Sequence, residues 1–284
     1  MEIIRFDRKD LRKLKTYEIH SDIYNTESYL YIYKNMLLKL FASKDEDVLN
    51  NKLFVLNKLF YLKEYINIKE FVWPESLAKI GSINKGYTME FIKNNTNLSL
   101  IFKSEKVSIE DKIFFLHTIL RIIERIEKEE VLNSVGFQLG DIHEGNFIYD
   151  NKNNMLKVID IDSAYIDGAY APTSKYLFLN DKLWDFSSKY PLDENDRHIP
   201  SKNTTIISLC YLILNVITEE YSPNLSTKEF CNILNNLASV GFNRELLDTI
   251  FNIYKKSDNY FDYNLVDTIT PKLVLKYKEK YVKK

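Results

Sequence analysis

Three oxygen-bearing side chains stand at short spacing near the middle of the 284-residue chain. Asp141 and Asn146 are five residues apart in the segment GDIHEGN, and Asp160 follows Asn146 by fourteen residues. Carboxylate and side-chain amide oxygens are hard ligands that suit Mg²⁺ held against phosphate groups. No set of histidine and thiolate ligands accompanies them, so the pattern indicates metal-assisted phosphoryl transfer rather than a zinc site.

A long helix and a β-hairpin are expected to position these three residues. Residues 108–130 begin with the capping sequence SIED and continue with apolar residues at helical spacing, which predicts a helix. Two apolar runs within residues 147–159 flank a polar turn and predict a hairpin. Asp141 and Asn146 would lie in the loop between helix and hairpin, and Asp160 would end the hairpin's second strand. The three side chains can therefore converge at the open end of the hairpin.

The first hundred residues predict short strands around one helix. Aromatic and aliphatic runs indicate strands at residues 21–26, 29–34, 36–41, 71–80 and 86–92, with turns at residues 34–35 and 81–85. Acidic residues 45–47 open a helical pattern whose apolar face contains Leu49, Leu53, Leu56 and Phe60. The asparagine-rich stretch 93–97 breaks the pattern, so we expect it to separate an N-lobe (residues 1–92) from a C-lobe (residues 93–284).

Beyond this stretch the sequence is mostly helical. Helical patterns recur at residues 204–219, 227–237 and 244–256. A long irregular segment, residues 162–203, precedes them, and a lysine-rich tail that we expect to be a solvated end follows. The chain shows no internal repeat.

The composition disfavours several classes of nucleotide-binding and hydrolytic site. The chain has only seven glycines, and they form no GxGxxG, GxxxxGK[ST] or GxSxG motif. A Rossmann dinucleotide site, a P-loop and a nucleophile elbow are therefore disfavoured. The four histidines include no HExxH pair, and two cysteines are too few for a disulfide scaffold or a thiolate zinc site.

Charge and hydropathy predict a cytoplasmic protein with no nucleic-acid or membrane partner. Lys and Arg number 39 and Asp and Glu number 40, so the formal net charge is −1 and no global basic field is expected. The N-terminal residues contain no apolar core of a signal peptide. The longest apolar stretch, residues 206–217, is interrupted by Ser208 and Asn215 and is too short to span a membrane.

The segment LGDIHEGN, residues 139–146, resembles the catalytic loop of the protein-kinase-like superfamily, which includes eukaryotic-type protein kinases and aminoglycoside and choline phosphotransferases. That loop has Asp, four residues and then Asn, and this segment is similar to the HGDxHxxN form of the small-molecule branch. The resemblance implies that Asp141 orients and deprotonates the accepting hydroxyl, and that Asn146 binds one Mg²⁺. It also implies that Asp160, within the strand end 158–162, binds the Mg²⁺ that bridges the nucleotide phosphates. Asp162 is the alternative ligand of that metal.

The resemblance extends towards the N-terminus. Residues 86–92, GYTMEFI, are similar to the strand and hinge at which kinases bind adenine. By this resemblance the residues that contact adenine are Met89, as gatekeeper, and the backbone of Glu90, Phe91 and Ile92. Residues 37–41, LLKLF, look like the third N-lobe strand, with Lys39 reaching the α- and β-phosphates of ATP. The implied fold is α+β and bilobal, with a small antiparallel N-lobe sheet, one N-lobe helix and a mainly helical C-lobe.

Four features depart from the superfamily pattern. The loop expected to cover the nucleotide, residues 21–27, contains no glycine. The usual histidine two residues before the catalytic Asp is Leu139, and the glycine of the DFG motif is Asp162. No helix glutamate is an obvious partner for Lys39, because the helix interior offers Asn50-Asn51 instead. We therefore do not predict an ion pair between Lys39 and this helix.

The expected function is ATP- and Mg²⁺-dependent phosphoryl transfer to a hydroxyl, as in a serine/threonine protein kinase. The aromatic and lysine content of residues 162–203 suits a protein acceptor. One alternative is transfer to a small hydroxylated molecule, which would be supported by acidic acceptor-pocket residues such as Glu219, Glu220, Glu245 and Asp248. The other alternative is a pseudokinase that acts as a regulatory binding module, which the departures above favour.

Overall fold

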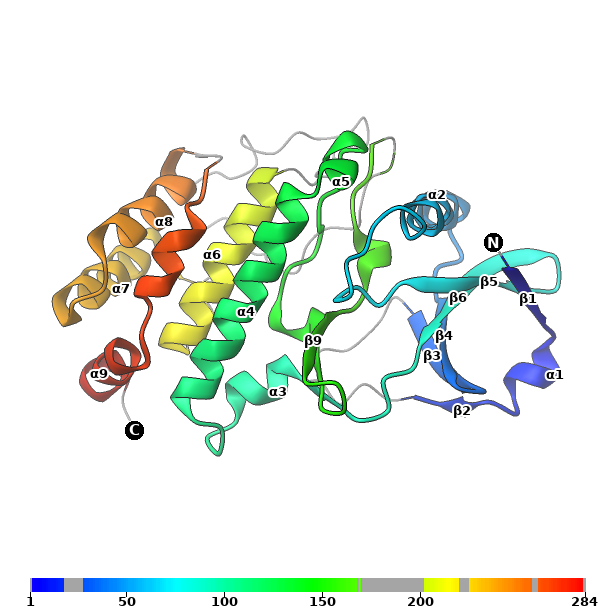
Figure 1. Ribbon diagram of the computed structural model, residues 1–284, viewed down its shortest axis with the longest axis horizontal. Coiled ribbons are helices and arrows are strands. Elements are labelled where there is room, and N and C mark those ends of the chain that lie inside the picture. Colours follow the sequence, from blue (N-terminus) through cyan, green and yellow to red (C-terminus); the bar gives the residue numbers. More distant parts are fainter. Residues whose placement is uncertain are drawn as a thin grey trace. The chain divides into compact units, whose positions relative to one another are not determined.

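A computed structural model shows a mixed α+β protein with a six-stranded sheet, a three-stranded sheet and many helices (Figure 1). It describes residues 2–17, 28–167, 169, 202–219, 225–256 and 260–282. Two compact units divide the chain, and each contains segments that are far apart in sequence. The first unit comprises Met1–Leu100, Glu130–Phe137 and Gly145–Ala171. The second comprises Ile101–Glu129, Gln138–Glu144 and Pro172–Lys284.

The first unit is built on the six-stranded sheet, whose strand order is β1-β5-β6-β4-β3-β2. The strands are β1 (Glu2–Phe6), β2 (Lys15–Thr16), β3 (Ser28–Tyr33), β4 (Met36–Phe41), β5 (Pro74–Ile80) and β6 (Ile83–Glu90). All neighbouring pairs are antiparallel except β1 and β5, which are parallel. The predicted antiparallel pairing is thus found in four of the five neighbouring pairs, and the N-terminal segment adds a parallel edge strand that was not predicted from its sequence.

The predicted strands agree with the sheet where short-range pairing decides the structure. Strand β4 spans the predicted residues, and a turn at Lys34, whose φ is +55°, joins it to β3. The β5–β6 turn is shorter than predicted, because Ile80 pairs with Ile83 and Gly81, with φ +61°, lies between them. The strand predicted at residues 21–26 lies outside the described residues.

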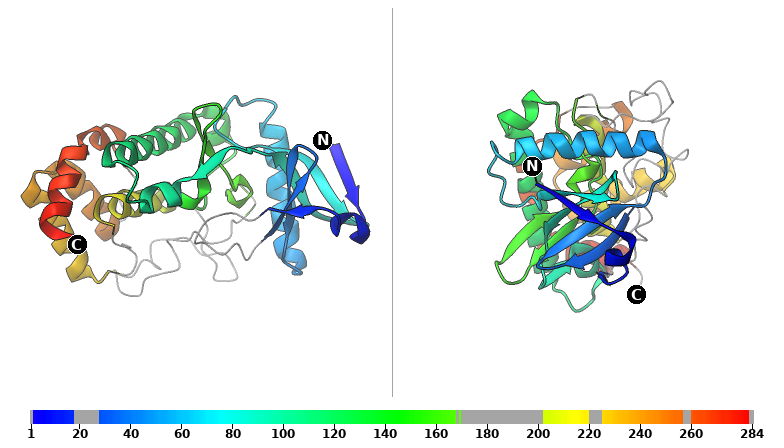
Figure 2. Two further views of the ribbon diagram at one scale, coloured as in Figure 1. Left: turned by 90° about the horizontal axis from the view of Figure 1, so that it is seen from below. Right: turned by 90° about the vertical axis from the view of Figure 1, so that its right-hand side faces the viewer.

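Helix α2 (Glu46–Leu62) packs along the sheet and contacts β5 and β6 (Figures 1 and 2). Asp45 caps its N-terminus by accepting hydrogen bonds from the backbone N–H groups of Asp47 and Val48. The buried face contains Leu49, Lys52, Val55, Leu56, Leu59 and Leu62. Leu53 and Phe60, predicted on the apolar face, are only half-buried. The helix is thus rotated from the predicted orientation, and a lysine lies within its buried face.

A three-stranded sheet in the same unit carries the predicted hairpin. It consists of β7 (Asn95–Asn97), β8 (Phe147–Asp150) and β9 (Met155–Val158), in that order. The stretch predicted to break the pattern therefore contains a strand, which pairs with β8. The end of β9 also pairs with the chain before β5, since Val158 N donates to Glu70 O at 2.8 Å and Val72 N donates to Val158 O at 3.0 Å. These bonds fix the chain direction just before Asp160.

The second unit is helical. Its longest helices are α4 (Ile109–Lys128), α6 (Lys202–Thr218), α7 (Thr227–Val240), α8 (Arg244–Lys256) and α9 (Pro271–Tyr281), and α3 (Leu98–Lys103) enters it from the first unit. Ser108 caps α4 as its sequence predicts, by accepting from Asp111 N at 3.0 Å. The lysine-rich tail is not simply a solvated end, because α9 buries Val274 and Tyr277.

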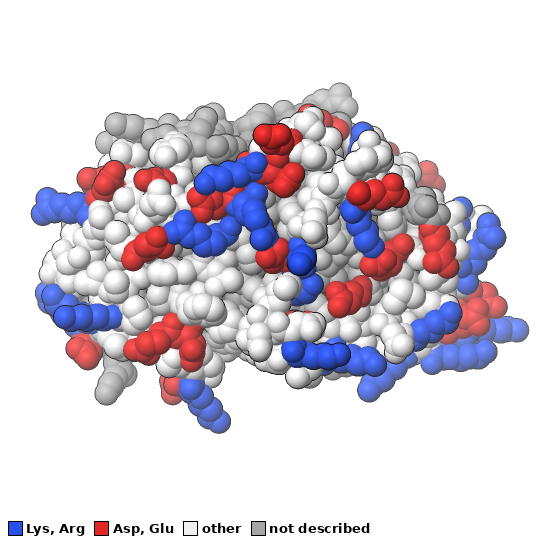
Figure 3. Space-filling model, viewed as in Figure 1, with Lys and Arg blue, Asp and Glu red and all other residues white. Residues whose placement is uncertain are grey.

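Two surface properties bear on the expected partners. No helix in the described parts of the chain is both long enough and apolar enough to cross a bilayer. On the face drawn in Figure 3, basic and acidic side chains of the described residues are interspersed rather than gathered by sign. The expectation that nucleic acid is not a partner remains a prediction.

Candidate functional site

Lys39 occupies a central strand with its side chain on a buried face. In β4, Leu38 and Leu40 pack with Phe6 on one side of the sheet, so Lys39 points to the other side. Its cross-strand partner is Tyr87 on β6. Gly86 permits this pairing, because a Cβ atom at that position would lie 1.9 Å from the carbonyl oxygen of Lys39. The close approach of β4 and β6 therefore places Lys39 and Tyr87 side by side.

Asp160 follows β9 in a strained conformation. Its φ of +62° and ψ of +29° are left-handed values, which are uncommon for a residue other than glycine. Ile159 N donates to the carbonyl oxygen of Asn146 at 2.9 Å, so this bend lies against the start of β8. A short 3₁₀ helix (Ile161–Ser163) follows, and Ser163 Oγ donates to Asp160 Oδ2 at 3.2 Å. The bend places Asp160 and Asp162 near the same sheet face as Lys39.

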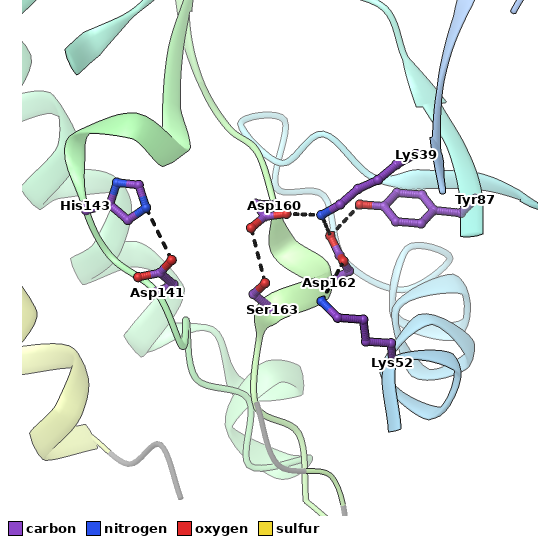
Figure 4. Close-up of polar contacts among 8 residues, drawn as sticks. All are labelled: Lys39, Lys52, Tyr87, Asp141, His143, Asp160, Asp162 and Ser163. Carbon is purple, nitrogen blue, oxygen red and sulfur yellow. Dashed lines mark hydrogen bonds and ion pairs between the residues drawn. The ribbon is translucent and has the colours of Figure 1, made fainter. Parts of the chain in front are cut away.

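The side chains of Lys39, Tyr87, Asp160 and Asp162 form a polar cluster that Lys52 of α2 joins (Figure 4). The Lys39 ammonium contacts Asp160 Oδ1 and lies 2.7 Å from Asp162 Oδ1. Tyr87 donates its hydroxyl hydrogen to Asp162 Oδ1 at 2.5 Å, and Lys52 Nζ lies 3.7 Å from Asp162 Oδ2. Lys39 thus has two carboxylate partners, neither of which comes from the helix.

Burial and charge determine the protonation states in this cluster. Burial alone would lower the pKa of Lys39, but the carboxylates of Asp160 and Asp162 raise it above its ordinary value. Burial and the same two carboxylates raise the pKa of Tyr87 well above its ordinary value. Lys39 is therefore a cation and Tyr87 a neutral donor at physiological pH. Two lysines and two aspartates balance the charge.

Asn146 lies at the end of a 3₁₀ turn (Glu144–Asn146) that opens into β8. Buried Asn97 holds this turn, because its Nδ2 donates to the carbonyl oxygen of Gly145 at 2.8 Å and its Oδ1 accepts from Ser99 N at 2.9 Å. Sequence reasoning missed Asn97, since its only signal was a place in an asparagine-rich stretch that suggested a linker.

The adenine-binding residues predicted from the hinge resemblance occupy the end of β6 and the residues after it. Met89 is buried, pairs with Leu37 and lies two residues after Tyr87 on the same strand, so it shares the sheet face of Lys39. Glu90 is exposed at the strand end, Phe91 is half-buried against Tyr17, and Ile92 is buried. The Ile92 carbonyl oxygen accepts a hydrogen bond from Asn95 Nδ2. Adenine binding here remains a prediction.

Asp141 belongs to the second unit and has a histidine beside it. His143 Nε2 lies 3.3 Å from Asp141 Oδ2, and the histidine is buried (Figure 4). The sequence prediction gave His143 no chemical role. The signal that could have indicated one is the two-residue spacing, which allows an Asp and a His in one loop to face each other.

The donor set fits Mg²⁺ better at Asp160 than at Asp162. The Asp160 side chain is 30% exposed, whereas that of Asp162 is 0% exposed and faces two ammonium groups. Among the described residues, no three His, Cys, Asp or Glu side chains gather as a metal site would require. An Asp160 carboxylate and an Asn146 amide suit Mg²⁺, which usually takes its remaining ligands from phosphate and water.

The chain matches no known protein-family model and no curated protein sequence. The resemblance to the kinase-like superfamily therefore rests on the residues quoted above, and the roles it implies are proposals.

Proposed function

We propose that this chain is an ATP- and Mg²⁺-dependent phosphotransferase with a bilobal, protein-kinase-like fold. The observation that supports this best is the buried, charged Lys39 facing Asp160, a partly exposed carboxylate that directly follows a hairpin. A fixed ammonium suits phosphate oxygens, and an accessible carboxylate suits a divalent metal. The order Lys39, hinge segment, Asp141, Asn146 and Asp160 along the chain is also that of the superfamily it resembles.

The first unit would hold the nucleotide. Lys39 would bind oxygens of the α- and β-phosphates, while Asp160 and Asn146 would hold Mg²⁺. When bound, this ion supplies positive charge that neutralises the charge developing on the transferred phosphoryl group. The backbone of residues 90–92 would bind the adenine edge, with Met89 behind it.

Asp141 would act on the acceptor. Its carboxylate would take the proton of the acceptor hydroxyl as that oxygen bonds to the γ-phosphorus and the bond from the γ-phosphorus to the departing ADP oxygen breaks. His143, 3.3 Å from the carboxylate, would keep Asp141 in the orientation that this transfer needs. Orientation matters because phosphoryl transfer depends mainly on positioning and charge stabilisation.

A serine or threonine of a protein is the proposed acceptor. The aromatic and lysine residues that suggest this occur in residues 162–203, most of which lie outside the described residues. A small cationic acceptor gains no support from Glu219, because its carboxylate already contacts Lys278 and lies 3.9 Å from Lys112. Glu220 lies outside the described residues, and Glu245 and Asp248 are exposed on α8.

The test is transfer of label from γ-labelled ATP, with Mg²⁺, to a generic protein acceptor. Asp141→Ala and Asp160→Ala should each lower the rate by about a thousandfold or more, since each removes a group that acts on the transferred phosphoryl. Asp267→Ala is the matched control, because this carboxylate is 60% exposed, pairs with Arg121 and has no role in the proposed transfer. It should leave the rate unchanged.

Thermal unfolding with and without Mg·ATP separates the competing functions. Stabilisation without protein labelling would contradict a protein acceptor. Hydroxylated amines would then be tried as acceptors, and their failure would favour a pseudokinase. A folded protein that shows neither stabilisation nor transfer would contradict the phosphotransferase.

A further inference from the structure

Asp162 has the most enclosed carboxylate of the polar cluster, and both of its oxygens face donors or cations. Oδ1 accepts from Lys39 at 2.7 Å and from Tyr87 at 2.5 Å. Oδ2 accepts no hydrogen bond but faces the Lys52 ammonium at 3.7 Å. A divalent cation at this carboxylate would lie beside two buried ammonium groups, which repel it strongly where the dielectric constant is low. The surroundings of Asp162 therefore favour ammonium groups over a divalent metal ion as partners of its carboxylate.

Lys52 explains how a buried aspartate can be held in place. It lies in the second turn of α2, is only 4% exposed and is surrounded on its helix face by leucine and valine. A buried ammonium requires charged or polar partners, and Asp162 provides one, while the Phe41 ring centroid lies 5.2 Å away. In the superfamily that the chain resembles, the helix provides a glutamate that pairs with the lysine. Here the helix provides a second lysine, Lys52, and the 3₁₀ turn after β9 provides the carboxylate.

We propose that Asp162 is a positioning residue that fixes the Lys39 ammonium, that Lys52 and Tyr87 hold Asp162 for this purpose, and that Asp162 does not bind metal. This inference rests on the proposed phosphotransferase function. The two aspartates have different roles, metal binding for Asp160 and positioning of Lys39 for Asp162. Asp160, partly exposed and strained, can turn from Lys39 to a metal, whereas Asp162 keeps Lys39 charged and in place when it does.

Nucleotide affinity distinguishes positioning from metal binding. Calorimetric titration with ATP, with and without Mg²⁺, would compare the wild type, Asp162→Asn, Lys39→Met and the double variant. Asp162→Asn should weaken Mg·ATP binding by about tenfold, and it should weaken it no further in the Lys39→Met background, because it acts through that lysine.

Asp160→Asn is the matched control for metal binding. It should abolish the gain in ATP affinity that Mg²⁺ confers, whereas Asp162→Asn should keep this gain. The inference is overturned if Asp162→Asn also abolishes the Mg²⁺ effect, or if the Asp162→Asn and Lys39→Met losses multiply.

A second double-mutant cycle, between Asp162 and Lys52, is measured by melting temperature and needs no nucleotide. Asp162→Asn leaves two buried lysines with one fewer negative charge and should lower the melting temperature by at least about 5 °C. Lys52→Met, added to Asp162→Asn, removes the excess cation and should raise the melting temperature again. A double variant that loses still more in melting temperature than Asp162→Asn would contradict the pairing of Lys52 with Asp162. If the wild type binds no nucleotide, the proposed function fails, and this cycle alone decides whether Lys52 holds Asp162.

Discussion

The carboxylate of Asp162 lies 2.7 Å from the ammonium of Lys39, although 123 residues separate them in the chain. One residue lies on the central strand β4, and the other lies in the 3₁₀ turn after β9. The contact joins the six-stranded sheet to the turn that follows the β8–β9 hairpin, and the candidate metal ligands Asn146 and Asp160 flank this hairpin. Stability and nucleotide binding are therefore expected to be linked at this point of the first unit.

His143 is expected to assist Asp141 without affecting nucleotide binding. His143→Ala should lower the rate of phosphoryl transfer by about ten- to a hundredfold, because a carboxylate that loses its orientation transfers the proton less well. The affinity for Mg·ATP should not change. His143→Gln, which keeps a hydrogen-bonding group, should recover part of the rate. Equal rates for the wild type and both variants would show that the 3.3 Å pair has no catalytic role.

Gly86 is expected to be indispensable to the sheet beside Lys39. Gly86→Ala should lower the free energy of unfolding by about 2–4 kcal/mol, because the added Cβ would meet the Lys39 carbonyl oxygen. Gly81→Ala is the control, since a Cβ there meets no atom within 4 Å and only the positive φ costs free energy, about 1 kcal/mol. Urea unfolding measures both. A smaller loss for Gly86→Ala than for Gly81→Ala would show that β4 and β6 do not approach this closely.

His117 on α4 is expected to make the protein less stable in mild acid. Burial lowers the pKa of His117 below 6.5, and nearby Asp267 opposes this only in part. A histidine whose pKa is depressed by folding contributes stability above its unfolded pKa, and that contribution is lost as the pH falls through the folded value. Between about pH 7.5 and about pH 5.5, the urea concentration at the unfolding midpoint should therefore decrease more for the wild type than for His117→Gln. Parallel pH profiles would contradict this assignment.

The C-terminal helix is expected to be part of the core of the second unit. Tyr277→Ala should lower the free energy of unfolding by about 3–5 kcal/mol, because the ring is almost fully buried. Leu275→Ala, on the exposed side of α9, should cost less than about 1 kcal/mol. Similar small losses for both variants in urea unfolding would show that α9 is a solvated end after all.

Local features of the structure could be predicted where neighbouring residues decide the conformation. The bounds of β4, the turn at Lys34, the cap at Ser108 and the β8–β9 hairpin all follow from patterns a few residues long. Hydrophobic alternation, a positive-φ turn and a capping side chain act over such distances and depend little on the rest of the fold. The positions of Asp141, Asn146 and Asp160 relative to these elements followed in the same way.

Contacts between distant segments could not be predicted in this way. The residues of β1 show no strong alternation of apolar and polar side chains. They form a strand because they pair with β5, more than seventy residues away in the chain. Lys52 carries no sequence signal for burial, since a lysine on a helix is usually exposed. Its burial depends on where α2 meets the turn that contains Asp162.

The sequence by itself determined which residues are proposed to bind metal and phosphate, because the residue types and their spacing are properties of the chain. The tertiary structure alone decided how far each carboxylate is buried and which side chains it contacts. Asp160 and Asp162 are indistinguishable as residue types two positions apart, yet one is partly exposed and the other is enclosed by Lys39, Tyr87 and Lys52. Burial and neighbouring charge set the partners of a carboxylate, and only long-range packing supplies them.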